Sequence, residues 1–154
     1  MKITMYILFF FLTFMQKENI MGQNKWMKFS VEMPDTLCEK QLDISILLKV
    51  ENLTSKSITI RNPAHWVNVS PHIRHDGKTV PQIKIKANLH LMKDTITIDG
   101  RGIFTVQFDY TLNALMGVEY CPIGVYEIYF IYEGKKEIES NVSNFVIRKC
   151  GNGK

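Results

Sequence analysis

Apolar residues recur at every second position along most of this chain. In the stretch LDISILLKVEN, which begins at Leu42, apolar side chains fall on one side of an extended chain and mostly polar ones on the other. The same alternation groups Phe29, Val31 and Met33; Ile58 and Ile60; Val67, Val69 and Ile73; Ile83 and Ile85; Ile96 and Ile98; Phe104, Val106, Phe108 and Tyr110; Tyr126, Ile128, Phe130 and Tyr132; and Phe145 and Ile147. This pattern predicts a series of short β-strands.

Turn-forming residues separate these predicted strands. Asp76-Gly77 is a tight hairpin signal, and Gly134-Lys135 predicts a two-residue loop between the last strands. The stretch at residues 111–117, TLNALMG, is the one that suggests a helical turn. Antiparallel strands with short connections need two sheets packed face to face to bury one side of each. The sequence therefore predicts an all-β antiparallel sandwich of about seven to nine strands.

The N-terminal segment has the pattern of a secretory signal peptide. Lys2 precedes an apolar run at residues 3–15, and a polar stretch leads to the small residue Gly22. As a helix, this run spans roughly 20 Å, which is too short for a hydrocarbon core of about 30 Å. We expect a signal peptide at 1–22, a domain at 23–154, and a secreted, periplasmic or cell-surface protein without membrane insertion after cleavage.

The length and charge of the chain indicate the number of domains and the class of partner. A chain of 154 residues with 45% hydrophobic content fits one folded domain. Its formal net charge is +4, and its basic residues are spread among acidic ones instead of forming a run. These features favour neither a nucleic-acid partner nor a membrane surface.

Two groups of residues resemble a known class of domain. The first is Val50, Glu51 and Asn52, followed after a polar gap by Ile58, Thr59 and Ile60; the second is Pro122, Gly124, Tyr126, Ile128, Phe130 and Tyr132, followed by Ser140, Asn141, Phe145 and Ile147. Over most of residues 27–149 the chain resembles the immunoglobulin-like modules of bacterial secreted proteins. The resemblance implies an immunoglobulin-like sandwich in which Tyr126 occupies a tyrosine corner, its hydroxyl bonded to the preceding connection. Such domains have many roles, so the fold does not give the function.

Three cysteines in an exported chain suggest one disulfide and one remaining thiol. If Glu133 pairs with Lys136 across the last hairpin, Cys121 lies close to the level of Cys150. We therefore expect a Cys121–Cys150 bridge. A Cys38–Cys121 bridge is the alternative, because the residues before the strand at Leu42 are expected at the same end of the sandwich.

No group of residues predicts catalysis or a cofactor. His72 and His75 are separated by two residues, which on a strand directs their side chains to opposite faces and counts against a shared metal. No serine lies in a GxSxG elbow, and no cysteine has a catalytic signature around it. We therefore expect a protein that is not an enzyme and has neither a cofactor nor a metal site.

Four residues are candidates for ligand contacts. Trp66, in the RNPAHW loop with Arg61 and His65, is either a platform for a sugar or protein partner or a plug that covers the end of the core. Tyr129 lies with Val125 and Ile131 on the expected outer face of one strand, which suggests that a partner, the N-terminal segment or another copy covers this face.

Three functions remain open. The leading hypothesis is a non-enzymatic exported binding or accessory module that recognises a protein or glycan. The alternative is a secreted protease inhibitor that inserts the loops Arg61–Trp66 and Asp99–Gly102 into a protease cleft. A third option is a metal-binding periplasmic protein.

Overall fold

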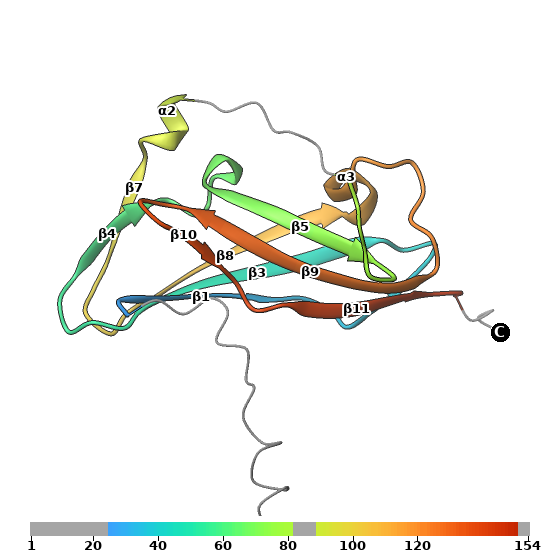
Figure 1. Ribbon diagram of the computed structural model, residues 1–154, viewed down its shortest axis with the longest axis horizontal. Coiled ribbons are helices and arrows are strands. Elements are labelled where there is room, and N and C mark those ends of the chain that lie inside the picture. The colour runs from blue at the N-terminus through green and yellow to red at the C-terminus, as the bar shows by residue number, and fades with distance from the viewer. Residues whose placement is uncertain (1–24, 82–88, 151–154) are drawn as a thin grey trace, which may run out of the picture.

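The computed structural model describes residues 25–81 and 89–150 (Figure 1). The strands are β1 (Met27–Glu32), β2 (Thr36–Cys38), β3 (Asp43–Asn52), β4 (Ile58–Arg61), β5 (Val69–His75), β6 (Lys78–Thr79), β7 (Thr95–Ile98), β8 (Ile103–Thr111), β9 (Gly124–Glu133), β10 (Glu137–Glu139) and β11 (Ser143–Arg148). The short helices are η1 (Trp66–Asn68), α2 (Leu89–Met92) and α3 (Leu112–Met116). The predicted strand around Ile83 and Ile85, like the predicted signal peptide, lies outside the described residues.

The strands form two main sheets and a small ribbon. Sheet 1 has the order β1-β3-β8, and sheet 2 has the order β2-β11-β9-β5-β6, with β10 also paired to β9. The ribbon pairs β4 with β7 and lies at the left end of Figure 1. All pairings between these strands are antiparallel except that of β2 with β11. The predicted all-β sandwich is confirmed.

The core lies between the two main sheets. The inner faces of β3 and β9 supply alternate buried side chains, among them Ile46, Leu48, Tyr126, Ile128 and Phe130. Intervening residues on these strands are exposed or half-buried, as the period of two predicts. Sheet-on-sheet packing therefore accounts for the burial of one face of each strand.

Of the two predicted tight turns, one is confirmed and the other is longer than predicted. His75 pairs with Lys78, and Asp76 and Gly77 have φ values of 46° and 75°, so the expected tight hairpin is confirmed. The last hairpin was predicted one residue too short: Glu133 pairs with Glu137, not with Lys136, and residues 134–136 form the loop. A helix of one turn, α3, is also confirmed.

Local hydrogen bonds explain the bounds of α3. Thr111 caps its first turn, because the Thr111 hydroxyl accepts a hydrogen bond from the backbone N–H of Ala114 at 3.4 Å. Gly117 ends it with a φ of 67°, a left-handed conformation that glycine adopts without steric cost.

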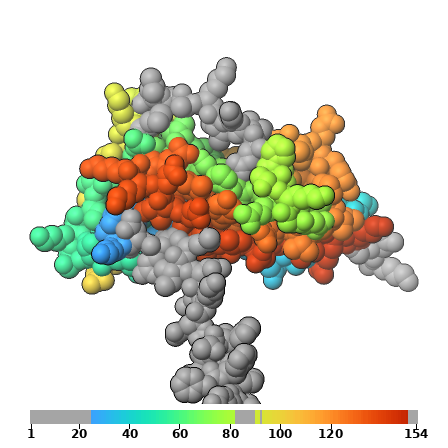
Figure 2. All heavy atoms as spheres, viewed as in Figure 1, coloured from blue at the N-terminus to red at the C-terminus, as the bar shows by residue number. Residues whose placement is uncertain are grey.

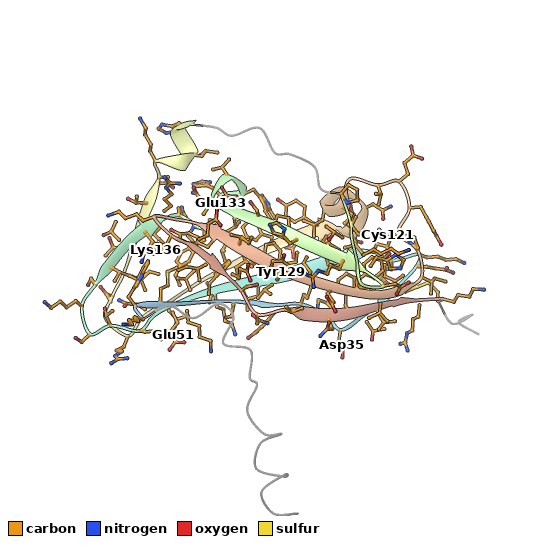
Figure 3. The ribbon with its side chains drawn as sticks, in the orientation of Figure 1. Asp35, Glu51, Cys121, Tyr129, Glu133 and Lys136 are labelled. Carbon is orange, nitrogen blue, oxygen red and sulfur yellow. A yellow bond between two sulfur atoms is a disulfide. The ribbon has the colours of Figure 1, made fainter. Side chains whose placement is uncertain are left out.

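The disulfide differs from both predicted pairings. Cys38 is bonded to Cys150, with the two Cα atoms 5.1 Å apart, and Cys121 is a buried free thiol. The parallel pairing of β2 with β11 places Cys38 opposite Arg148, two residues before Cys150. Cys121 lies before the first residue of β9 and packs beneath α3 instead (Figure 3), where its sulfur is 3.7 Å from that of Met116. The predicted Cys121–Cys150 and Cys38–Cys121 bridges are therefore wrong.

The described residues include no helix with the length and apolar character that a membrane crossing requires.

Candidate functional site

A groove of about 740 Å³ lies where the β4-β7 ribbon meets the end of β9. Its apolar lining includes Trp26, Ile58, Ile60 and Tyr132; its charged lining consists of Arg61, Lys93 and Lys135. Figure 2 shows segments from distant parts of the sequence meeting at this left end of the molecule: blue from the N-terminal part, green and yellow from the ribbon, and orange-red from the end of β9. We call this site the ribbon groove.

Asn52 holds the ribbon in place. It is fully buried at the end of β3, and its side-chain nitrogen lies 2.8 Å from the carbonyl oxygen of Lys56, 3.1 Å from that of Ile98 and 2.8 Å from that of Asp99. Its side-chain oxygen accepts a hydrogen bond from the backbone N–H of Thr54 at 2.9 Å. One buried amide thus joins the turn before β4 to the end of β7.

Arg61 connects the ribbon to β9. Its guanidinium donates a hydrogen bond to the backbone oxygen of Glu133 at 3.1 Å, and its own backbone oxygen accepts one from the Tyr132 hydroxyl at 3.1 Å. Burial is the main reason that the pKa of Tyr132 is raised, so this phenol stays a hydrogen-bond donor throughout the physiological range. The groove wall is therefore fixed at both strands.

The ribbon groove is positively charged. Within residues 25–81 and 89–150, Arg61, Lys93 and Lys135 form no salt bridge, and the described residues that line the groove include no carboxylate. Lys93 and Lys135 are exposed at the rim. The site thus combines aromatic and aliphatic walls with cations that have no acidic partner in the described part of the chain.

Of the four predicted contact residues, Arg61 is the one that lines this groove. His65 lies nearby, where its Nε2 is 2.8 Å from a carboxylate oxygen of Asp94. The same oxygen accepts a hydrogen bond from the Asn62 amide at 2.9 Å. The hydrogen bond from Asn62 is the main reason that the pKa of Asp94 is lowered, and the one from His65 is the second. His65 is thus engaged in holding its own loop.

Trp66 is half-buried and packs against the core. Its ring centroid is 4.7 Å from that of Phe108, 5.1 Å from that of Tyr110 and 5.9 Å from that of Phe130, so it contacts both main sheets. Its indole N–H donates a hydrogen bond to the Tyr110 hydroxyl. These contacts favour the second interpretation of Trp66, in which the ring covers the end of the core.

Tyr129 lies on the outer face of sheet 2, midway along β9 (Figure 3). Its ring stacks on that of His72, directly opposite on β5, at 5.0 Å, and the Arg74 guanidinium lies 5.9 Å from its centre. Arg74 also forms a salt bridge with Glu127 at 3.4 Å. This outer face is separate from the ribbon groove, so the structure does not bring the four predicted residues into one site.

The two loops proposed for protease inhibition are folded back on themselves. In the Arg61–Trp66 loop, the Asn62 side chain accepts a hydrogen bond from the backbone N–H of Ala64 at 3.0 Å. In the Asp99–Gly102 loop, the N–H of Gly102 donates to the oxygen of Asp99 at 2.9 Å, and that of Arg101 to the oxygen of Thr54 at 2.8 Å. Both are compact turns, not extended segments.

No described group of three or more His, Cys, Asp or Glu side chains is arranged to hold a metal ion. The buried Cys121 thiol donates a hydrogen bond to the Asn113 side-chain oxygen at 2.8 Å, and burial raises its pKa. A raised pKa keeps the sulfur protonated, whereas a nucleophilic cysteine needs the thiolate.

Sequence reasoning missed most of the ribbon groove. Trp26, Ile58, Ile60, Lys93 and Lys135 come from separate segments, and no local motif joins them. The sequence contains no signal for this site, because Lys93 is followed directly by Asp94 and the lack of salt bridges to these lysines among the described residues appears only in the packed structure.

Comparisons with known proteins leave the family open. No protein-family model matches the chain, and no curated protein does. A β-glucosidase from Listeria innocua, solved with glucose, is 11% identical with a TM-score of 0.45, over 82% of this chain and 17% of that one. The alkylpurine DNA glycosylase AlkC from Pseudomonas fluorescens, bound to DNA containing an abasic site analogue, is 12% identical with a TM-score of 0.49, over 89% of this chain and 33% of that one.

A β-glucosidase from Erythrobacter marinus, EmGH1, is 11% identical with a TM-score of 0.45, over 79% of this chain and 15% of that one. The chain therefore matches one third or less of each of these proteins. At these identities and TM-scores, the likenesses carry no argument about function.

Proposed function

We propose that this chain is a non-enzymatic binding module that recognises an acidic, partly apolar segment of a partner protein in the ribbon groove. The observation that supports this proposal is the combination of apolar walls with Arg61, Lys93 and Lys135, which have no acidic partner among the described residues. A ligand that fills the groove must bury apolar surface and also supply negative charge.

The walls favour a peptide over a neutral glycan. Ile58 is a half-buried branched aliphatic side chain that packs well against other apolar side chains, whereas Ile60, on the same face of β4, is only 5% exposed. Lysine and arginine donate hydrogen bonds but accept none, so the side-chain acceptors that sugar hydroxyls could use in this groove are hydroxyl oxygens, among them those of Thr59 and Thr95. Asp or Glu side chains satisfy the cations, and neighbouring apolar side chains cover the walls.

Two features support an exported, immunoglobulin-like module. The Tyr126 hydroxyl donates a hydrogen bond to the backbone oxygen of Pro122 at 2.8 Å, which is the geometry expected of a tyrosine corner. The Cys38–Cys150 disulfide is typical of proteins that work in oxidising compartments, consistent with the proposed signal peptide at 1–22 and domain at 23–154.

Fluorescence anisotropy with four labelled peptides of equal length tests the proposal. One peptide combines Glu with Leu and Phe, and the others lack the acidic residues, lack the apolar residues, or replace Glu by Lys. We expect the acidic apolar peptide to bind most tightly. The double variant Lys93→Gln/Lys135→Gln should weaken it about tenfold, because two rim charges contribute roughly 0.5 to 1 kcal/mol each.

The matched control is Lys28→Gln/Lys40→Gln, which removes the same charge at exposed positions that do not line the groove. Equal weakening by both double variants, or equal binding of the acidic and neutral apolar peptides, contradicts the proposal. A parallel panel of cysteine and serine proteases tests the inhibitor alternative, which near-stoichiometric inhibition would support.

A further inference from the structure

One edge of sheet 1 is an unprotected strand. β8 is nine residues long and pairs with β3 on one side; among the residues that the structure describes, no strand pairs with its other side. It contains no proline and no lysine, and Asp109 is its one charged residue. Long, regular edge strands without such features tend to pair with another chain.

The other sheet edges are short or capped. β2 and β6 have three and two residues, respectively. On β1, the Asn141 side chain covers the outward backbone of Val31, accepting a hydrogen bond from its N–H at 2.7 Å and donating one to its oxygen at 3.0 Å. Of the terminal strands in the two main sheets, β8 is thus the longest in the described part of the molecule.

The hydrogen-bond pattern identifies the free backbone groups of β8. The N–H of Asn52 donates to the oxygen of Gly102, and that of Leu112 to the oxygen of Leu42, both continuing the β3-β8 register. Because bonded and non-bonded pairs alternate in an antiparallel ladder, the even-numbered residues of β8 bond to β3. Ile103, Thr105, Gln107 and Asp109 therefore direct their N–H and C=O groups outward.

We propose that β8 pairs with β8 of a second copy of this chain, antiparallel, about a two-fold axis at Gln107. With this centre, all nine residues have partners, and the outward groups of Gln107 face each other as a bonded pair. The single charge is also accommodated, because Asp109 lies opposite Thr105 of the second copy instead of opposite another carboxylate.

The inner face of β8 is self-complementary in the same register. Phe104 pairs with Tyr110 of the second copy, and Val106 pairs with Phe108. Aromatic pairs and aromatic pairs with β-branched residues stabilise adjacent strands. All four side chains are half-buried in one copy, whereas the apolar residues opposite them on β3 are fully buried. A second β8 would extend the sheet beside this incompletely covered row.

Sedimentation equilibrium of the purified protein over a range of concentrations tests the proposal. We expect a monomer–dimer equilibrium that Gln107→Pro abolishes, because proline removes an N–H that points to the free edge and leaves the bonds to β3 intact. Thr105→Asp should weaken dimerisation by placing two carboxylates opposite each other, and Thr105→Lys should strengthen it.

The last pair separates dimerisation from folding, because Lys49 lies opposite Thr105 on β3 of the same copy. Within one copy, Asp at this position is favoured by Lys49 and Lys is disfavoured, which is the reverse of the effects expected on the dimer. A protein that stays monomeric at about 1 mM overturns the proposal. So does a dimer that responds equally to Thr105→Asp and Thr105→Lys. A dimer that is lost in the Lys93→Gln/Lys135→Gln variant and unaffected at Thr105 would assign self-association to the ribbon groove and also overturn it.

Discussion

The Cys38–Cys150 bridge should supply a large share of the stability of this domain. It joins residues 112 positions apart, so it encloses nearly the whole described chain. In the chain-entropy account, a closed loop of this size lowers the entropy of the unfolded state by about 16 cal/mol/K, or about 5 kcal/mol at 25 °C. Strain and residual unfolded structure reduce such values, and measured contributions of disulfides typically reach about 2 to 4 kcal/mol.

Urea unfolding of the oxidised protein and of the variant Cys38→Ala/Cys150→Ala measures this contribution. With a slope of about 1 to 3 kcal/mol/M, a loss of about 3 kcal/mol lowers the midpoint by roughly 1 to 3 M. The slope of the variant should also increase, because its unfolded state is less compact and exposes more surface. The control is Cys121→Ala, which removes a buried sulfur without opening the bridge.

Two results would refute this reasoning. One is an oxidised protein whose midpoint lies within about 0.3 M of that of the double variant, because this corresponds to less than about 1 kcal/mol. The other is a peptide map of the oxidised protein in which Cys121 is cross-linked. The second result would restore one of the pairings predicted from the sequence and remove the 112-residue loop from the calculation.

Three further predictions concern single side chains. Trp66→Ala should lower the free energy of unfolding by about 3 kcal/mol, and loss of peptide binding with unchanged stability would contradict its role as a core plug. Tyr126→Phe should cost about 1 kcal/mol in thermal or urea unfolding through its lost hydroxyl bond, and a neutral effect would contradict the tyrosine corner. Folding lowers the pKa of Asp94 from its ordinary value of 3.8. The stabilising effect of this carboxylate is therefore present above about pH 4 and disappears as the pH falls below the folded pKa. In an acid titration, Asp94→Asn should lose less stability than the unchanged protein, and identical stability profiles would contradict this.

The alternation of apolar residues was enough to predict the sandwich because each strand has one buried face. The segment from Leu42 to Val50 has strict alternation at its inner positions, and β3 buries Ile44, Ile46, Leu48 and Val50, while Leu42, just before the strand, is half-buried. Asp76-Gly77 likewise formed the predicted hairpin, since both residues tolerate the left-handed backbone that this turn requires. Local chemistry was sufficient for both features.

The disulfide could not be predicted in this way, because it depends on pairing between distant strands. Each one-residue change in a hairpin shifts every opposed pair that follows it. The loop after Glu133 is longer than predicted. The register then shifts by one more residue between β10 and β11: Glu139 lies opposite Ile131, whereas Ser143 lies opposite Ile128. The parallel pairing of β2 with β11 gave no local signal at all.

The ribbon groove depends on a further layer of contacts that also fixes its shape. The buried Asn68 side chain donates a hydrogen bond to the backbone oxygen of Asn62, and the Asn62 side chain in turn bonds to Asp94, next to the rim residue Lys93. On the opposite wall, the Tyr132 hydroxyl bonds to the backbone of Arg61. Because these bonds join residues of the chain to one another, the protein itself holds the groove walls in place, and this lowers the entropic cost of binding a peptide. The buried polar residues that look like departures from a simple sandwich thus hold the proposed binding site in its working geometry.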